Sequence, residues 1–159
     1  MTVSSVQKKR NKYMRLTETW PANPNRAFDL FSKFPAEEMR FGNPAAGMDR
    51  KQFDAYVQGL RDESMGIGLQ DGWVPATKYI LINDESDYVG IFNLRHRFTD
   101  FLSNGPGHIG YGVAREYRGR GYSTVGLKLT LIKARELGIE EAYLSVAIRC
   151  LWWVMVKWW

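Results

Sequence analysis

One stretch of this chain constrains its fold more than any other. It begins with an apolar, strand-like run over residues 108–113 and continues through a short loop that holds Gly119 and Gly121. A helical pattern follows over residues 120–137, and Gly138 supplies a left-handed stop. A strand, a glycine loop and a helix N-terminus in this order present unpaired backbone N–H groups and positive dipole charge to an anion, above all to a phosphate.

The loop departs from two common phosphate-binding motifs. A P-loop needs a lysine directly after its last glycine, whereas the next lysine here is Lys128. The dinucleotide fingerprint needs a third glycine where this chain has Thr124. The pattern that fits is Arg118-x-x-Gly121-x-Ser123. It resembles the Gln/Arg-x-x-Gly-x-Gly/Ala signature of the GNAT superfamily of acyl-CoA N-acyltransferases.

The resemblance runs over about residues 13–146 and is most specific over residues 108–146. It implies an α+β fold: a central mixed, mostly antiparallel sheet, a parallel strand pair joined by a buried helix, and helices on both faces. It also implies acetyl-CoA as cofactor, with the diphosphate on the loop and the pantetheine arm along a bulged strand. The residues expected to bind the cofactor are Tyr111, Gly112, Val113, Arg118, Gly119, Arg120, Gly121, Tyr122, Ser123 and Thr124.

The other elements follow from periodicity. Alternation predicts strands over residues 13–18, 78–83, 88–96 and 142–146, and apolar stripes predict helices that begin at Asn23 and Asp49 and end near Phe34 and Met65. We expect one domain over residues 13–159 behind a flexible basic tail at residues 1–12. Trp73, in the glycine-rich loop 66–75, walls a substrate pocket or plugs the core, and the flap 97–107 is expected to help form the pocket.

Composition narrows the partners. A net charge of +5 comes partly from the basic tail. Because this tail has no interleaved aromatic side chains for base stacking, we do not expect nucleic acid as the partner. The longest apolar run, residues 150–156, is too short to span a bilayer. One cysteine, Cys150, permits no intrachain disulfide and no zinc cluster, and it reads as a structural thiol. We expect no metal site and a cytoplasmic location.

Acyl transfer to an amine needs a group that removes the ammonium proton and a donor that polarises the thioester. Relatives place a glutamate near the position of His108, so His108 is the predicted base, beside the alternative of an ordinary strand-end histidine. Asn93 and His96 are candidates to line the same cleft, and Asp100 and Glu116 are weaker candidates for the base. The resemblance assigns the polarising N–H to the backbone near Val113. A relay through water without a dedicated base is also compatible with the pattern.

The chain departs from the family after residue 146. Relatives continue with a helix, which often carries a tyrosine that protonates the leaving thiolate, and with two more strands. No tyrosine follows Tyr143 in this chain. The sequence therefore predicts missing C-terminal strands, an open edge at residues 142–146, and a helical face that contains Trp152, Met155, Val156 and Trp159. Four tryptophans in the last eight residues predict either self-association through this end, as a homodimer, or poor solubility.

Three functions are compatible with the sequence. The first is an N-acetyltransferase that acts by direct transfer from acetyl-CoA to a primary amine. The second is a non-catalytic acyl-CoA-binding or regulatory module of the same fold. The third is a nucleic-acid-associated protein that uses the basic tail. For the first, a small amine, an amino acid, an antibiotic and a protein N-terminus all remain possible acceptors.

Overall fold

The computed structural model describes residues 14–103, 105–147 and 151–157, with side chains up to residue 144. A six-stranded sheet has the order β1-β4-β5-β6-β7-β8, and a two-stranded sheet joins β2 to β3. The elements are β1 (Arg15–Glu18), α2 (Pro24–Ser32), β2 (Glu37–Glu38), β3 (Phe41–Gly42), α3 (Arg50–Ser64), β4 (Ala76–Ile82), β5 (Tyr88–Arg95), α4 (Asp100–Ser103), β6 (Ile109–Val113), the 3-10 turn η1 (Arg115–Tyr117), α5 (Tyr122–Glu136), β7 (Glu141–Ala147) and β8 (Leu151–Lys157).

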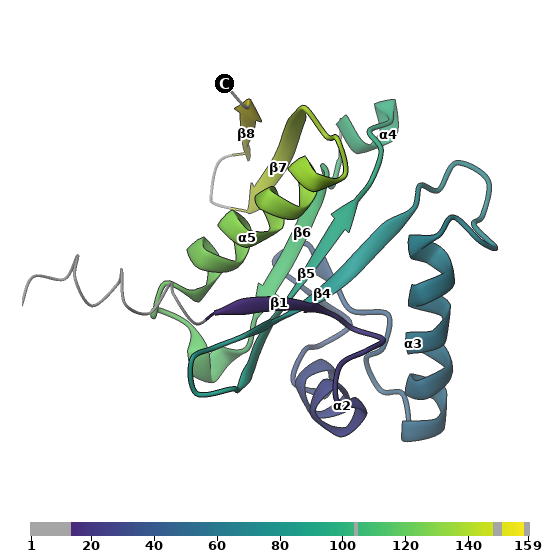
Figure 1. Cartoon of the computed structure of the whole chain (residues 1–159), viewed down its shortest axis with the longest axis vertical. Coiled ribbons are helices and arrows are strands. Elements are labelled where there is room, and N and C mark those ends of the chain that lie inside the picture. Colours follow the sequence, from purple (N-terminus) through teal and green to yellow (C-terminus); the bar gives the residue numbers. More distant parts are fainter. Residues whose placement is uncertain (1–13, 104, 148–150, 158–159) are drawn as a thin grey trace, which may run out of the picture.

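Sheet direction agrees with the predicted fold class. Strands β4, β5 and β6 form an antiparallel meander, and β1 pairs antiparallel with β4. Strand β7 runs parallel to β6, and α5 connects the two. In Figure 1, α5 lies on one side of the sheet and α2 and α3 lie on the other. The α+β fold with a mostly antiparallel sheet, one parallel pair and helices on both faces is therefore confirmed.

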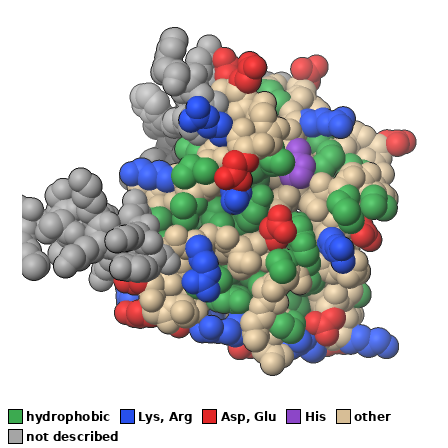
Figure 2. Space-filling model, viewed as in Figure 1, with side chains coloured by type: hydrophobic (Ala, Val, Ile, Leu, Met, Phe, Trp, Pro, Cys, Tyr) green, Lys and Arg blue, Asp and Glu red, His purple; other side chains and the backbone are tan. Residues whose placement is uncertain are grey.

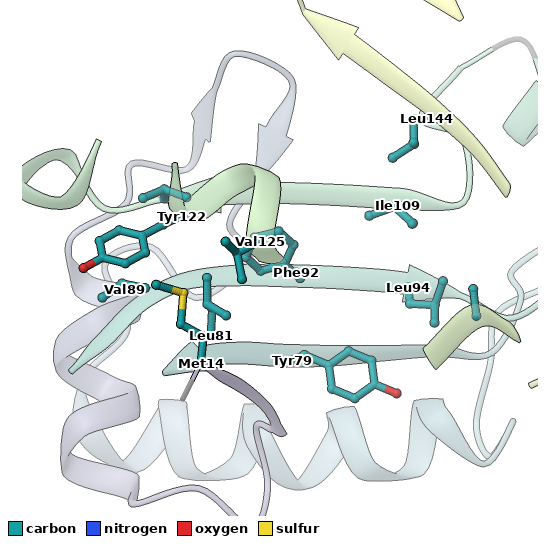
Figure 3. Packing of buried hydrophobic residues seen from close by; sticks show 12 residues of the cluster. Met14, Tyr79, Leu81, Val89, Phe92, Leu94, Ile109, Tyr122, Val125 and Leu144 are labelled. Atoms are coloured by element: carbon teal, nitrogen blue, oxygen red, sulfur yellow. The ribbon is translucent and has the colours of Figure 1, made fainter. Parts of the chain in front are cut away.

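Alternating side chains of the strands form two cores. On β4, Tyr79 and Leu81 belong to the core beneath α5, whereas Ile80 and Ile82 belong to the core beneath α2 and α3. Figure 3 shows the first of these cores, with Phe92 of β5 beneath Val125 of α5. This period of two is what a sheet covered on both faces requires.

The two N-terminal helices begin where their caps predict. The Asn23 side chain accepts hydrogen bonds from the N–H groups of Asn25 and Arg26, both at 3.1 Å, and Pro24 occupies the first helical position. Asp49 forms a reciprocal capping box with Gln52 at 2.9 Å in each direction. Both helices are thus capped at their N-termini.

Helix α5 is less buried than its apolar composition predicts. The exposed positions include the predicted polar stripe, but Ile132 is 53% exposed and Leu137, the C-cap, 48%. The buried line consists mainly of small residues, including Gly126 and Thr130, whose hydroxyl bonds the Gly126 carbonyl at 2.8 Å. Small residues bring the helix axis close to the sheet, so the larger leucines lie at the flanks of the contact.

The end of the chain differs from the prediction. Residues 151–157 form a strand, not a helix, and β8 pairs antiparallel with β7 over its whole length. Strand β7 is therefore not an open edge, and at least one strand follows it. A run of β-branched and aromatic residues favours a strand once a neighbouring edge is available, which the helical reading of residues 152–156 overlooked. The basic tail at 1–12, Cys150 and Trp159 lie outside the described residues.

The predicted bulge in β6 is absent from its pairing with β5. Register is continuous from Leu94 opposite Ile109 to Gly90 opposite Val113. The register shift of the meander lies between Leu81 and Ile82, on β4. What distinguishes β6 is its other edge, where one register pair with β7 is found among the described residues.

Candidate functional site

A cleft of about 1020 Å³ lies on the α2/α3 side of the sheet and reaches the loop before α5. Its floor comes from β4, β5 and β6, and its walls come from the β2–β3 hairpin, the loop 66–75 and the segment around α4. The lining includes Glu37, Glu38, Met39, Phe41, Glu63, Trp73, Ala76, Lys78, Asn93, Arg95, Phe101, Gly110, Tyr111, Gly112, Val113, Arg118, Gly119, Gly121, Tyr122 and Ser123.

The loop before α5 presents a row of free N–H groups at one end of this cleft. Gly119 and Gly121 have φ angles of 72° and 81°, in the left-handed region that glycine favours. The first backbone bond of the helix runs from Val125 N to Gly121 O, and no side chain caps the helix. The N–H groups of residues 119–124 therefore have no acceptor within the described part of the chain. Together with the dipole of a 15-residue helix, these groups form a site for an anion.

Arg118 is the loop arginine that borders the cleft. Its Nε donates to the Val113 carbonyl at 2.8 Å, and its Nη2 donates to Glu38 Oε2 at 2.7 Å. Hydrogen bonding by Arg118 lowers the pKa of Glu38, with Arg115 as a weaker contributor at 3.3 Å. Arg118 is therefore held across the mouth of the cleft by a carboxylate that a stronger anion could replace.

The other two loop arginines point elsewhere. Arg115 is 77% exposed in its side chain, and Arg120 lies 5.7 Å from the Tyr117 ring centroid. Neither lines the cleft. They add positive potential near the loop without a direct place in the site.

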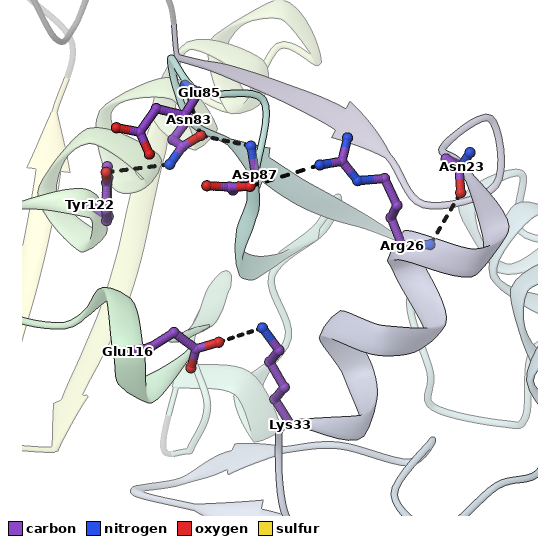
Figure 4. A network of polar contacts seen from close by, with 8 residues as sticks. All are labelled: Asn23, Arg26, Lys33, Asn83, Glu85, Asp87, Glu116 and Tyr122. Carbon is purple, nitrogen blue, oxygen red and sulfur yellow. Dashed lines mark hydrogen bonds and ion pairs between the residues drawn. The ribbon is translucent and has the colours of Figure 1, made fainter.

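Two polar contacts hold the loop against its neighbours. Lys33, after α2, is paired with Glu116 of η1, and Asn83 donates to the Tyr122 hydroxyl at 3.5 Å (Figure 4). The Lys33 hydrogen bond lowers the pKa of Glu116. Glu116, a weaker candidate for the base, is thus engaged outside the cleft.

The edge of β6 beside the loop lacks a full strand partner. Ile109 is opposite Leu144 of β7, and that is the one register pair between these strands among the described residues. The backbone of residues 110–113 is therefore available on this edge for an extended ligand. A Cβ on Gly110 would meet nothing within 4 Å, so this part of the floor is open.

Lys78 and Arg95 also line the cleft, on strands β4 and β5. Sequence reasoning missed both residues. Lys78 pairs in register with Asn93, and Arg95 pairs with Ala76. Lys78 Nζ lies 3.5 Å from Asn93 Oδ1, and Arg95 Nη1 donates to the Gly107 carbonyl at 3.2 Å. Burial lowers the pKa of both cations, against a smaller opposite effect of Glu63. A cation at an inward position of an otherwise apolar strand was the signal that could have identified them.

The histidines lie outside the cleft lining. The His108 ring is 4.6 Å from the Phe98 ring centroid, and its Nδ1 accepts the Tyr143 N–H at 3.2 Å. Burial lowers the pKa of His108, with a further decrease from Arg95. His96 Nε2 contacts the Thr77 hydroxyl at 2.8 Å, and burial lowers its pKa as well. A base role for His108 would require the ring to leave its stack, and that role stays a prediction.

Three exposed hydrophobic side chains surround the cleft. Met39, Trp73 and Phe101 are 73%, 62% and 77% exposed, and all three line it. They come from three separate segments: the β2–β3 turn, the loop 66–75 and α4. Of the two readings of Trp73, the structure supports the pocket wall.

Most of the predicted cofactor residues meet at this cleft. Arg120 and Thr124 do not line it, and neither does the predicted base His108. Those that do are Tyr111, Gly112, Val113, Arg118, Gly119, Gly121, Tyr122 and Ser123. Of the other candidates for the cleft or the base, Asn93 lines it, whereas His96, Asp100 and Glu116 do not.

The chain is similar in sequence to a known protein family. The sequence model of the acetyltransferase (GNAT) family matches residues 47–149, more than half of the chain. The chain belongs to the GNAT family. One solved structure, of a GCN5-related N-acetyltransferase from Kribbella flavida, is similar over 83% of this chain and 74% of its own, at 12% identity and a TM-score of 0.42. No curated protein matches the chain.

The described part of this GNAT chain shows neither a membrane-spanning helix nor a cluster of metal-binding side chains. On the face seen in Figure 2, basic and acidic side chains are interspersed and form no single basic surface. Acyl transfer is the general activity of the GNAT family to which the chain belongs.

Proposed function

We propose that this GNAT protein transfers an acetyl group from acetyl-CoA directly to a primary amine. The observation that carries the proposal is the row of N–H groups at residues 119–124 without an acceptor in the described chain, at one end of a cleft of about 1020 Å³. The diphosphate of coenzyme A suits these donors, and Arg118 lies beside them.

The residues of the chain bind and orient the reactants. The open edge of β6 at residues 110–113 would hold the pantetheine arm as an added strand, and a backbone N–H near Val113 would polarise the thioester carbonyl. When bound, acetyl-CoA supplies a thioester whose carbonyl carbon is attacked by the neutral amine, with a C–N bond formed and the C–S bond broken. Orientation of the two reactants within one cleft is the main contribution expected from the protein.

Proton removal is assigned to water in the cleft, with His108 kept as the alternative. The cleft contains several carboxylates, and His108 has no contact with it. The acceptor ammonium would lose its proton to ordered water, and the departing thiolate would gain one from solvent. One cysteine in the whole sequence and the use of acetyl-CoA favour the cytoplasm as the place of reaction.

Calorimetry and thiol release test the proposal together. Acetyl-CoA should bind the wild type, and Arg118→Glu should weaken binding roughly tenfold or more, because a charge-assisted contact becomes a repulsion. Lys51→Glu, an exposed charge reversal on α3, is the matched control and should leave affinity unchanged. Free thiol should appear with acetyl-CoA and an amine library. Binding without thiol release would instead support the non-catalytic acyl-CoA-binding module.

The predicted homodimer remains a proposal. Strand β8 is the last strand of the sheet on its side, so the edge available for pairing with another copy lies there and not at β7. Sedimentation over a range of concentrations would show association, and a monomer at high concentration would contradict it.

A further inference from the structure

The far end of the cleft contains two cations that form no ion pair within the described part of the chain. Lys78 and Arg95 come from neighbouring strands and both line the cleft. Neither side chain has a carboxylate within 4.0 Å among the described residues. Glu63 also lines the cleft and acts on both cations at longer range, without an ion pair.

The position of these cations is unusual for a strand. On the same face of the sheet, Ile80 lies two residues after Lys78 on β4, and Ile91 lies four residues before Arg95 on β5. Both isoleucines are fully buried in the core under α2 and α3. Lys78 occupies the next inward position on β4, in line with Asn93 and Gly110 across the sheet. Lys78 and Arg95 are both partly buried, and an unpaired charge in such a place is costly, so an apolar residue would be the stabilising choice here. A ligand that carries the missing negative charge would remove this cost.

Both cations retain donors for such a ligand. Lys78 has three N–H donors and one long contact, to Asn93, and Arg95 has five donors and one contact, to the Gly107 carbonyl. The contact to Gly107 fixes the guanidinium beside the segment that leads into β6. A planar carboxylate is the group that a fixed guanidinium and an ammonium recognise together.

The rest of the cleft indicates which molecule carries the carboxylate. The diphosphate site lies at the opposite end, at residues 119–124, so the cations face the acceptor and not the phosphates of the cofactor. The exposed rim of Met39, Trp73 and Phe101 offers apolar contacts to the same molecule. A protein N-terminus has no carboxylate beside its amine, whereas a free α-amino acid has one.

We propose that the acceptor is a free amino acid with an apolar or aromatic side chain, whose carboxylate binds Lys78 and Arg95. This inference rests on the proposed acetyl transfer and names its acceptor class. The ammonium, attached to the same Cα as the carboxylate, would then lie over the floor formed by residues 110–113, beside the free edge of β6 where the pantetheine arm is placed. The side chain would extend to the rim.

Matched acceptors test the proposal in the transfer assay. L-Phenylalanine, phenylalaninamide and phenethylamine share an aromatic group and an amine, but only the first has a carboxylate. We expect kcat/KM for L-phenylalanine to exceed that of the other two by roughly tenfold or more, since a charge-assisted pair is lost with each. Equal kcat/KM values for all three would overturn the proposal. Glycine should have a lower kcat/KM than L-phenylalanine because it lacks a side chain for the apolar contact. Equal kcat/KM values for glycine and L-phenylalanine would show that the rim does not contact the acceptor.

Variants locate the effect. Lys78→Met keeps the apolar stem and should raise KM for L-phenylalanine roughly tenfold while leaving that of phenethylamine nearly unchanged. Arg95→Gln should act in the same direction, and Lys51→Met on α3 is the control that should change neither. An unchanged KM for L-phenylalanine in the Lys78→Met/Arg95→Gln double variant would refute the assignment. Thermal melting with acetyl-CoA verifies that each variant is folded and binds the cofactor.

Binding of a product analogue separates this inference from the proposed function. N-acetyl-L-phenylalanine and its amide differ only in the carboxylate, and their affinity is measured by calorimetry without turnover. A preference for the acid that disappears in Lys78→Met supports the anion site even if no amine is acetylated. Equal affinity for the acid and the amide refutes the site even if the protein acetylates amines.

Discussion

Gly126→Ala should destabilise the protein although alanine is the better helix former. Gly126 is in α5, and a Cβ built on it would lie 2.0 Å from Cζ of Phe92 and 2.5 and 2.6 Å from two other ring atoms. The Phe92 ring is fully buried in the core beneath α5. To reach ordinary contact at ~3.5 Å, the helix would have to move away from the sheet by about 1.5 Å.

Two opposing effects set the size of the change. Replacement of glycine by alanine inside a helix gains about 1 kcal/mol, whereas overpacking of a rigid core costs about 1–3 kcal/mol and occasionally more. Because three ring atoms lie closer than 3.0 Å, we expect the overpacking cost to lie at the upper end of its range. After subtraction of the helix-propensity gain, the net loss of stability is about 1–2 kcal/mol. For a chain of 159 residues this corresponds to roughly 2–8 °C in Tm.

A matched glycine provides the control. Gly59 is exposed in α3, and a Cβ there would meet nothing within 4 Å, so Gly59→Ala should stabilise the protein by about 0.5–1 kcal/mol. Urea unfolding measures both variants. The Gly126→Ala/Phe92→Leu pair should lose less stability than the sum of its single variants, because the smaller side chain leaves room for the new methyl group.

The refuting result is simple. If Gly126→Ala is as stable as the wild type, the contact between α5 and Phe92 does not set the height of the helix. A shift of α5 also moves the N–H groups at residues 119–124 relative to β6, so Gly126→Ala should weaken acetyl-CoA binding while Gly59→Ala should not. Calorimetry on the same samples measures this second effect.

Two further predictions concern ionisable groups. Because burial lowers the pKa of His108 in the folded state, its contribution to stability is present above ~6.5 and is lost as pH falls below that value. His108→Asn, whose amide oxygen can accept the hydrogen bond of the Tyr143 N–H, should therefore lose less stability than the wild type between pH 7.5 and 5, as measured by urea unfolding. A fall in kcat of ~100-fold in the same variant would identify His108 as the base. Tyr56→Phe should be neutral or stabilising by up to about 1 kcal/mol, because the Tyr56 hydroxyl is buried without a partner among the described residues, and a clear loss of stability would contradict this.

Local signals carried much of the fold prediction. The caps at Asn23 and Asp49, the strand patterns over residues 78–83 and 88–96 and the glycine loop before α5 are short-range patterns. Each of them predicted an element within a few residues of its observed place. Strand β8 depends on pairing with β7, which no local pattern encodes. Its aromatic run was therefore predicted to have the period of a helix, whereas it forms a strand.

The part of the site that backbone groups form could be predicted from the sequence, whereas the part that side chains form could not. The N–H groups before α5 follow from the order of strand, glycines and helix. Lys78 and Arg95 meet because β4 and β5 pair in a particular register, and that register was not determined by spacing along the chain. His108 was named from its residue type, but its neighbours Phe98 and Tyr143 are brought to it by tertiary structure.

The narrow junction between β6 and β7 has a consequence for motion. Few backbone links join the β7–β8 hairpin to the remainder of the sheet in the described structure: the pair Ile109–Leu144, the bond from His108 N to Tyr143 O and a bridge at Gly107, beside the contact of the Tyr143 N–H with the His108 ring. A unit attached so sparsely opens at a lower free energy than the meander does. Amides of β7 should therefore exchange with deuterium before those of β5, and a ligand seated along the free edge of β6 would slow that exchange by closing the gap.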